Sequence, residues 1–296
     1  LLGTLYPLAL DALGMGKISV GPPYFDAVFV PIMTPLVFLM GVGPLARWKS
    51  AELPSLAKRL RWAAVLTVVA ALLTGWLAGR ISVMATPGFL MAWWIVFAVA
   101  TDLIERVRPA SVAASNLWAR LKLVPRTMWG MWLAHVGVAA FAFGVSMVNT
   151  YRVERDVKME MNDTVEVAGY VFTYRGVRDA QGPNYQAAQG LVEVTRNGQP
   201  VATMRPEKRV YRVQQNPMTE AAIDTGFTRD LYVSLGEPVG ANNAWVVRVY
   251  FKPFIDWIWG GCVLMAIGGV LAATDRRYRA TSRDRARMDV PATAAS

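Results

Sequence analysis

The chain has 296 residues, of which 54% are hydrophobic and 18% are charged, and its formal net charge is +10 at pH 7. The mean hydropathy is +0.30, and several apolar runs have roughly 20 residues, the length that crosses a hydrocarbon core about 30 Å thick. Such runs exclude an ordinary soluble domain and predict an α-helical polytopic membrane protein.

Five complete transmembrane helices are predicted, at residues 24–42, 62–79, 88–104, 128–148 and 254–274. Residues 1–10 resemble the end of a further span truncated at its N-terminus, because no initial methionine and no basic segment precede them as they would in a signal peptide. The chain is therefore interpreted as a fragment of a longer protein or as one natural subunit of a split protein.

Basic residues mark the predicted cytoplasmic side. Of the 31 lysines and arginines, 16 fall in the loops 47–61 and 105–126 and in the tail 275–296. Since such residues accumulate in cytoplasmic loops, the tail is predicted to be cytoplasmic and the segment 149–253 exoplasmic. That segment has 13 basic and 12 acidic residues, so the positive charge belongs to topology determinants beside anionic lipid and not to a nucleic-acid-binding surface.

The segment 149–253 is predicted to form a small all-β domain inserted between the fourth and fifth spans. Residues 164–177 alternate between apolar and polar, and Asn197-Gly198 separates two further strand-like runs, which is the strongest short-range signal for a β-hairpin. Further strands are predicted at 208–213, 229–235 and 244–251. About 100 residues suffice for a modest core.

Few polar residues near or in the predicted spans can carry chemistry. Cys262, the single cysteine, is interpreted as a small packing residue buried in the last span. Asp102 and Asp256 lie near span ends, where solvation at the interface is expected. The sequence has no glycine-rich phosphate loop and no metal-spaced cluster of histidine or cysteine, which excludes nucleotide-driven and hydrolytic mechanisms.

His135 is the only histidine of the chain and lies inside the apolar span 128–148. An ionisable group inside a bilayer is costly and is by default a functional hypothesis, and imidazole is a common axial ligand of haem iron. On helical spacing His135 shares a face with the small residues Ala139, Ala142 and Ser146, which either allow close helix packing or leave a slot for a flat macrocycle. The residues alone leave open a ligand or proton-relay role and a hydrogen bond between helices.

Five long strings cover most of the chain outside the segment 50–125 and the last residues. They are GPPYFDAVFVPIMTPLVFLMGVGPLARWK (21–49), LAHVGVAAFAFGVSMVNTYRVERDVKM (133–159), RGVRDAQGPNYQA (175–187), RPEKRVYRVQQNPMTEAAIDTGFTRDLYVSLGE (205–237) and WVVRVYFKPFIDWIWGGCVLMAIGGVLAATDRRYR (245–279). Together they are similar to the C-terminal part of the CcmF-type cytochrome c haem lyases.

The resemblance implies a multispan protein of the bacterial cytoplasmic (inner) membrane whose family attaches haem to apocytochrome c on the periplasmic side. A membrane-anchored haem chaperone delivers the substrate haem, whose vinyl groups react with the thiols of a Cys-x-x-Cys-His motif. Thioredoxin-like and apocytochrome-presenting maturation subunits are the other implied partners. The family also holds a permanent haem b between two membrane histidines, and His135 in the LAHVG string looks like one of these axial ligands. Its other ring nitrogen is expected to donate to an acceptor on a neighbouring helix.

The chain also departs from the family pattern. The family's Trp-Trp-Asp-like haem-handling motif and its flanking histidines are absent, since Ala92-Trp93-Trp94-Ile95 is not that motif and no second histidine exists. The chain is therefore expected to supply half of a bis-histidine site. The second ligand and the substrate-haem site are expected in the N-terminal part of the same lyase, and the chain alone is expected to be inactive.

Arg209, Arg212 and Arg229 are candidates for contacts with haem propionates or an acidic partner, because a guanidinium binds carboxylates with a planar fork. A solvated face of the β-domain is the alternative. Two other function classes stay open: a transporter would need polar groups that converge near the bilayer midplane, and a non-catalytic scaffold would need no intramembrane histidine. His135 lies about 10 Å along the helix from Met128, a depth that fits electron supply better than thioether chemistry.

Overall fold

The computed structural model describes residues 2–16, 21, 24–46, 52–108, 117–213, 215–240 and 244–275. Arg47, Lys49 and the predicted basic tail from residue 276 onward are not among the described residues. The chain divides into two compact units. The first contains Leu1–Leu73, Leu90–Ala139 and Leu264–Ser296, and the second contains Thr74–Phe89 and Ala140–Val263.

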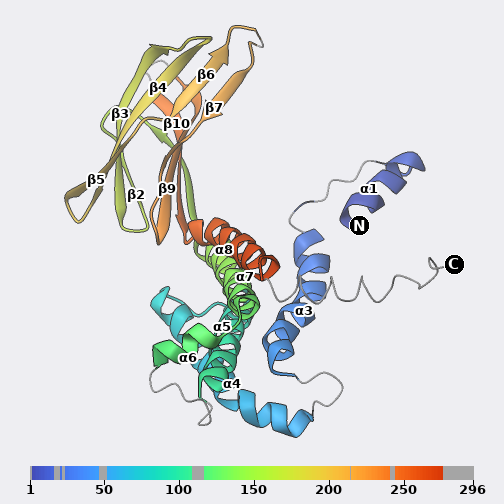
Figure 1. Cartoon of the computed structure of the whole chain (residues 1–296). Coiled ribbons are helices and arrows are strands. Elements are labelled where there is room, and N and C mark those ends of the chain that lie inside the picture. The colour runs from blue at the N-terminus through green and yellow to red at the C-terminus, as the bar shows by residue number, and fades with distance from the viewer. Residues whose placement is uncertain are drawn as a thin grey trace, which may run out of the picture. The chain divides into compact units, whose positions relative to one another are not determined.

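Five helices of the described residues are long and apolar enough to cross a membrane, as predicted. They are α3 (Val30–Val42, between the π-helix η1, Phe25–Phe29, and the 3-10 helix η2, Gly43–Leu45), α4 (Leu53–Leu77), α5 (Thr86–Val107), α7 (Arg126–Tyr151) and α8 (Asp256–Ala273). The shorter helices are α1 (Leu2–Ala12) and α6 (Leu117–Leu123). Figure 1 shows these helices in chain order.

The helices extend beyond the apolar runs that predicted them. Helix α4 begins at Leu53, well before the predicted residue 62, so Lys58, Arg59 and Arg61 lie on a helix and not in a loop. Leucine, alanine, lysine and arginine are all good helix formers. The helix therefore begins before the apolar run, and hydropathy alone places its start too late in the sequence.

In the first unit, α5 packs against three other spans. Trp94 of α5 donates its indole N–H to the carbonyl oxygen of Phe38 in α3 at 2.9 Å, and it is buried with Leu60 of α4. On another face of α5, Ile95 is buried against Trp132 of α7. Apolar side chains therefore hold this unit together, and indole N–H groups are paired where they are buried.

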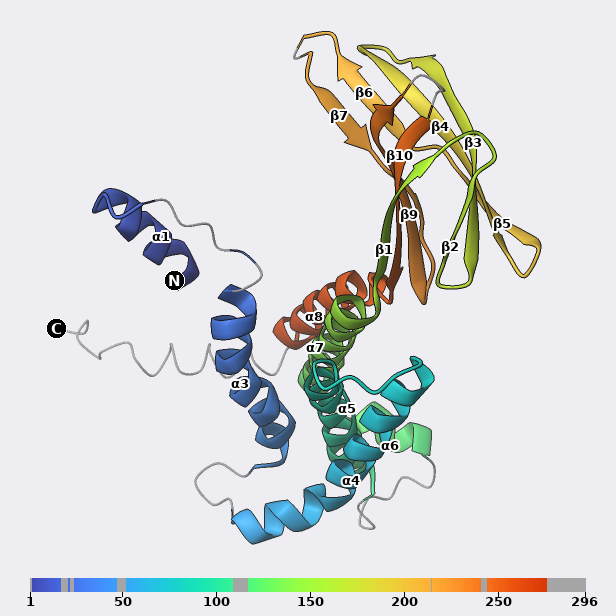
Figure 2. The same ribbon diagram turned by 180° about the vertical axis from the view of Figure 1, so that it is seen from behind.

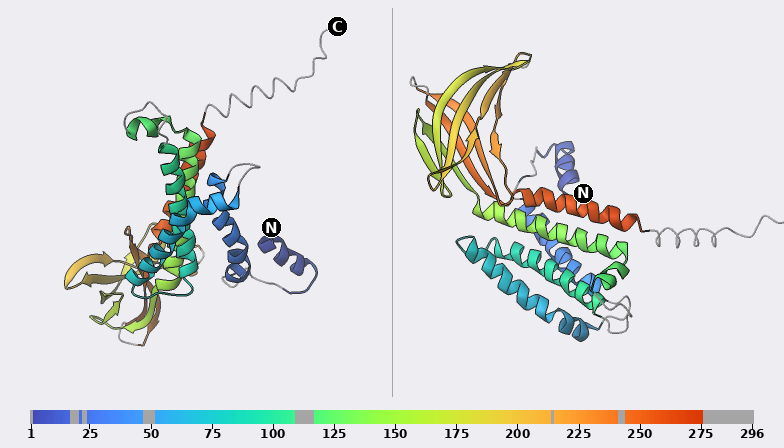
Figure 3. Two further views of the ribbon diagram at one scale, coloured as in Figure 1. Left: turned by 90° about the horizontal axis from the view of Figure 1, so that it is seen from below. Right: turned by 60° about the vertical axis from the view of Figure 1, so that its left-hand side comes forward.

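Helices α7 and α8 run side by side, as the right-hand view of Figure 3 shows, and they touch through small residues. A Cβ atom on Gly130 of α7 would lie 2.5 Å from the carbonyl oxygen of Gly268 in α8, and a Cβ atom on Gly268 would lie 2.5 Å from the carbonyl oxygen of Gly130. Ala134 and Ala272, each four residues after a glycine, complete the contact. This is the small-xxx-small packing of membrane helices.

The segment between α7 and α8 folds into a sandwich of two antiparallel sheets (Figures 1 and 2). One sheet has the order β1 (Val153–Met159), β10 (Ala244–Pro253), β9 (Arg229–Val239), β8 (Ala222–Asp224). The other has the order β2 (Thr164–Val167), β3 (Tyr170–Gln181), β4 (Tyr185–Arg196), β6 (Glu207–Tyr211), β7 (Pro217–Glu220), with β5 (Gln199–Met204) also paired to β4. Apolar side chains from both sheets, among them Phe172, Val192, Leu231 and Val247, form one buried core.

Two tight turns explain the hairpins of the second sheet. Asn197 and Gly198 have φ angles of 51° and 75°, which confirms the predicted hairpin. The alternating segment 164–177 forms two strands, because Ala168 and Gly169 take φ angles of 52° and 77° and divide it into β2 and β3. The sequence analysis also missed β1, β7 and β8, the short or outer strands.

Two polar residues differ from their predicted surroundings. Asp102 is not solvated at the interface: it is 3% exposed, its carboxylate forms an ion pair with Arg106 at 3.0 Å, and it accepts the indole N–H of Trp132 at 2.8 Å. A buried carboxylate requires such partners. Cys262 is exposed on α8 and not buried, because it lies on a face that no described part of the chain covers.

Candidate functional site

His135 lies on α7, in the part of that helix that belongs to the first compact unit. The ring is half-buried, and its Nδ1 lies 2.8 Å from the carbonyl oxygen of Met131, one helical turn earlier. If Nδ1 carries the proton, it donates to this carbonyl and leaves Nε2 with a free lone pair, as an axial metal ligand requires. The acceptor offered to Nδ1 lies on the same helix, whereas the sequence analysis expected one on a neighbouring helix.

The residues present fit one half of a haem site. An imidazole oriented by a backbone carbonyl is a suitable axial ligand for a b-type haem. Within the described part of the chain, no group of three or more metal-binding side chains gathers around any position. With one histidine in the sequence, this chain offers a single imidazole.

The small residues that follow His135 pack against α5. Ala139 is buried together with Ile95 and Val99 of α5. Ser146 donates its hydroxyl to the carbonyl of Ala142 at 2.7 Å, and its oxygen would lie 1.8 Å from a Cβ atom on Gly88 of α5. The structure thus places Ala139 and Ser146 against α5.

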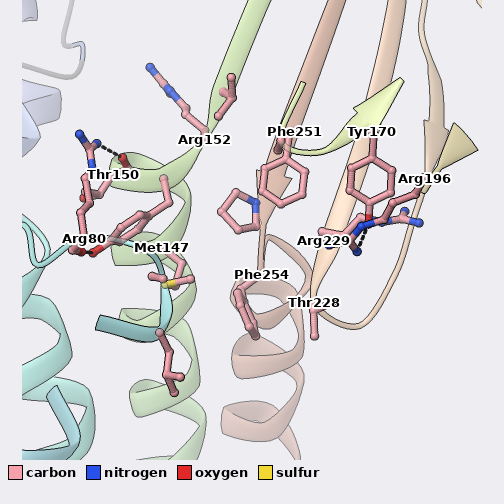
Figure 4. Close-up of a pocket in the computed structure, with 17 residues that line it drawn as sticks. Arg80, Met147, Thr150, Arg152, Tyr170, Arg196, Thr228, Arg229, Phe251 and Phe254 are labelled. Atoms are coloured by element: carbon pink, nitrogen blue, oxygen red, sulfur yellow. Dashed lines mark hydrogen bonds between the residues drawn. The ribbon is translucent and has the colours of Figure 1, made fainter. Parts of the chain in front are cut away.

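A second concentration of polar groups surrounds a pocket of about 720 Å³ in the second unit (Figure 4). We call it the arginine pocket because four of its lining residues are Arg80, Arg152, Arg196 and Arg229. None of the described residues that line it is acidic. The walls come from the ends of α4 and α7 and from one end of the sandwich, where β3 and β9 begin and β4 and β10 end.

Tyr170 fixes two of these arginines. Arg196 donates from Nη1 to the Tyr170 hydroxyl at 3.0 Å, and Arg229 donates to it from Nε at 3.2 Å. Both guanidinium groups also lie over the tyrosine ring, 4.7 Å and 5.3 Å from its centre. Asp224 forms an ion pair with Arg229 at 2.5 Å. The cation–π contacts and hydrogen bonds hold both side chains in place.

Arg80 lies on the opposite side of the pocket from this pair (Figure 4). It donates from Nη2 to the carbonyl oxygen of Thr150 at 3.0 Å, and the Tyr151 hydroxyl donates to the carbonyl of Arg80 at 2.7 Å. Thr150 belongs to the last turn of α7, whose carbonyls have no helical partners. Arg80 therefore caps this helix, and Arg152 beside it forms an exposed ion pair with Glu154 at 3.4 Å.

Phe254 forms part of the apolar wall between the two sides. Its φ angle is 54°, a left-handed conformation that bulky residues rarely adopt. The conformation is held by its N–H, which donates to the carbonyl oxygen of Thr228 at 2.9 Å, and by ring contacts with Phe143 and Trp257. The pocket is thus preformed around a strained residue.

The other predicted arginines lie elsewhere on the sandwich. Arg209 stacks over Tyr185 at 4.5 Å and forms ion pairs with Glu207 and Glu220, and it lowers the pKa of the Glu207 carboxyl by hydrogen bonding. Arg212 is exposed at the end of β6. Only Arg229 of the three predicted arginines lines the pocket, and the sequence analysis missed Arg80, Arg196 and Tyr170, which no sequence motif connects.

The architecture has known relatives. The family model described as the CcmF C-terminal beta-sandwich matches residues 150–253, the whole sandwich. A cytochrome c-type biogenesis protein CcmF from Pseudomonas aeruginosa is 45% identical over 97% of this chain, and one from Escherichia coli is 42% identical over 94% of it. The chain belongs to the CcmF family.

CcmF relatives are longer than this chain, which spans 43% of the Pseudomonas aeruginosa protein and 41% of the Escherichia coli protein. A solved structure of "Cytochrome c Heme Lyase CcmF" has a similar fold, with a TM-score of 0.70 and 22% sequence identity over 92% of this chain and 42% of that one. Five apolar helices and the CcmF sandwich are thus found in one chain, and it is a membrane protein.

Proposed function

We propose that the chain is a membrane subunit of a bacterial cytochrome c haem lyase and carries one axial ligand, His135, of a transmembrane b-type haem. In this role it assists the reduction of haem and its thioether attachment to the Cys-x-x-Cys-His motif of apocytochrome c. The names of the relatives and of the similar solved structure support the maturation role. The half-buried His135 ring, with Nδ1 at the Met131 carbonyl, is the observation that carries the ligand assignment.

The proposed topology places the sandwich on the periplasmic side of the inner membrane. Arg106, Arg120 and Arg126 lie near the C-terminal end of α5, on α6 and at the start of α7, and clustered basic residues favour the cytoplasmic side. Helix α7 then runs outward, and its last residue, Tyr151, precedes the sandwich. The C-terminal tail is cytoplasmic in the same arrangement.

The position of His135 along α7 suits electron supply. At about 1.5 Å per residue it lies roughly 13 Å from Arg126 and roughly 24 Å from Tyr151, so it is far from the end of the helix that leads into the sandwich. A bound b-type haem supplies an iron centre that accepts and donates one electron. His135 binds and orients that group, and it has no part in forming the thioether bond.

The remaining components of the proposal lie outside this chain. The second axial histidine and the substrate-haem site belong to the N-terminal part of the same lyase, and a haem chaperone delivers the substrate haem. Thioredoxin-like and apocytochrome-presenting subunits complete the partners. Arg212, which is exposed, is the sandwich arginine best placed to meet an acidic partner, because Arg209 is already paired with two carboxylates.

The ligand assignment is tested by His135→Ala in the full-length lyase, expressed with the other maturation components. We expect the variant to accumulate in membranes at the normal level, because alanine is a better helix former than histidine. It should lose the absorption of the b-type haem and most of the covalent attachment of haem to cytochrome c. Added imidazole should restore part of the haem spectrum.

Ser146→Ala is the matched control on the same helix, since it removes one polar group that bonds only to its own helix. This variant should keep the haem spectrum. If His135→Ala leaves both the b-type haem and cytochrome c maturation intact, the ligand assignment is wrong and a non-catalytic scaffold becomes the better interpretation. Loss of haem in Ser146→Ala alone would move the haem contact towards the periplasmic half of α7.

A further inference from the structure

The arginine pocket carries positive charge that its surroundings do not neutralise. Arg152 and Arg229 each have a carboxylate partner, Glu154 and Asp224. Arg80 and Arg196 form no ion pair with any residue that the structure describes. We propose that the pocket binds the phosphate of an anionic phospholipid headgroup. The proposal does not depend on the proposed haem site.

The surroundings of the pocket place it at the level of lipid headgroups. Its walls include the last turns of α4 and α7, two apolar helices long enough to cross a membrane. Trp76 and Leu77 at the end of α4 are 68% and 70% exposed, and Val83 and Met84 in the following connection are 87% and 84% exposed. Exposed tryptophan and aliphatic residues at the end of a span are typical of the membrane interface.

The donors of the pocket match a phosphate group. Each guanidinium has five N–H donors, and Arg196 uses one of them on the Tyr170 hydroxyl. That hydroxyl accepts from two arginines and keeps its own proton to donate to a phosphate oxygen. Arginine forks and a hydroxyl donor are the groups that bind phosphate most specifically.

The remaining wall fits the rest of a lipid. Phe251, Phe254 and Met147 line the pocket between the two arginine sides, and they offer apolar contact to a glycerol backbone and the first methylene groups. A volume of about 720 Å³ lies within the range of small-molecule sites, roughly 300–1,000 Å³. A zwitterionic headgroup would bring its own cation next to Arg80 and Arg196, so an anionic headgroup is favoured.

The test measures lipid binding to the full-length protein in detergent by native mass spectrometry, with dioctanoyl phosphatidylglycerol and dioctanoyl phosphatidylcholine as probes. We expect the wild type to prefer phosphatidylglycerol. Arg196→Gln should lower that affinity by about fivefold, the effect of one basic residue near an anionic lipid. Tyr170→Phe keeps the ring and should lower the affinity by about threefold to tenfold.

Arg155→Gln is the control, because Arg155 is exposed on β1 of the same sandwich and does not line the pocket. It should leave the affinity for phosphatidylglycerol unchanged. Equal affinity for the two lipids, or an equal loss in Arg155→Gln, would overturn the proposal. Competition by inorganic phosphate at the same concentration as lipid would assign a free-anion site instead, and displacement of the lipid by haem would assign the arginines to propionates.

Discussion

Gly130 of α7 and Gly268 of α8 each occupy the space where the other would carry a side chain. A Cβ atom on either would come within 2.5 Å of the other's carbonyl oxygen, a distance at which backbone must move. Neither glycine has a positive φ angle, so the close approach of two backbones explains both residues and conformational freedom does not. Gly130 lies five residues, about one and a half turns, before His135 on α7, so the contact bears on the position of the proposed haem ligand.

Gly268→Val should therefore separate α7 from α8. We expect a loss of stability of about 1–3 kcal/mol, typical of overpacking a close contact, together with weaker haem retention in the full-length protein. Thermal unfolding in detergent and the haem absorption spectrum measure the two effects. Gly269→Val is the control, because a Cβ atom on Gly269 meets nothing within 4 Å, and similar losses in both variants would contradict the packing explanation.

Replacing Tyr174 of β3 with phenylalanine should stabilise the folded protein. Its side chain is 0% exposed, and its hydroxyl has no hydrogen-bond partner among the described residues, which leaves the desolvation of that group uncompensated. Tyr174→Phe should raise the free energy of unfolding by about 1 kcal/mol. Tyr232→Phe, at a half-buried tyrosine stacked on Tyr250, should change it little. A destabilised Tyr174→Phe variant would mean that the hydroxyl has a partner.

Tyr174 should also make the stability of the fold depend on pH in the alkaline range. Burial raises the pKa of the Tyr174 hydroxyl from 10.0 to about 12, so the folded chain holds this proton more tightly than the unfolded chain. A raised folded-state pKa adds stability below pH 10 that is lost as the pH rises towards 12. Urea unfolding between pH 9 and about 11 should show a shallower decline for Tyr174→Phe than for the wild type. Parallel declines for the two proteins would argue against the shift.

Asp102 should tolerate an amide better than an apolar side chain. Asp102→Asn keeps an oxygen that can accept the indole N–H of Trp132 and loses the ion pair with Arg106, whose side chain is 42% exposed. Asp102→Leu leaves the Trp132 N–H unpaired, which costs about 1–3 kcal/mol. Thermal unfolding should rank wild type, Asn and Leu in that order. Asp156→Leu, at an ion pair that is 51% exposed on both sides, should cost under about 1 kcal/mol.

The chain expressed alone should not retain a stoichiometric b-type haem, because it has one histidine and a bis-histidine site needs two. Haem content per purified chain, measured as the pyridine complex, tests this. Co-expression with the N-terminal part of the lyase should restore haem. Stoichiometric haem in the chain alone would contradict the half-site proposal and would point to a different second ligand.

The sequence predicted the helices well because length and hydropathy determine which segments can cross a bilayer. It predicted the Asn197-Gly198 turn for the same kind of local reason, a dipeptide with a strong conformational preference. The turn at Ala168-Gly169 was missed because the apolar alternation continues on both sides of it. Hydrophobic periodicity alone therefore does not show where one strand ends and the next begins.

Long-range contacts account for the rest. The ion pair of Asp102 with Arg106, four residues along the helix, was within reach of sequence reasoning, whereas its bond to Trp132 depends on how two helices meet. Arg80, from the connection after α4, lines the same cavity as Arg196 of β4 and Arg229 of β9, and these three residues are far apart in the sequence. Sequence patterns therefore predict single helices and strands, whereas the sites form where elements that are distant in the sequence come into contact.

The first and last strands of the sandwich bring the beginning and the end of this domain close together. Val153, which follows α7, faces Phe251, close to the start of α8, across adjacent antiparallel strands, so the two connections to the helices are about 5 Å apart. A domain with adjacent termini can be gained, lost or exchanged while the host helices stay joined by a short link. The sandwich is in this sense a replaceable module, and a foreign domain with similarly close ends could be transplanted between α7 and α8.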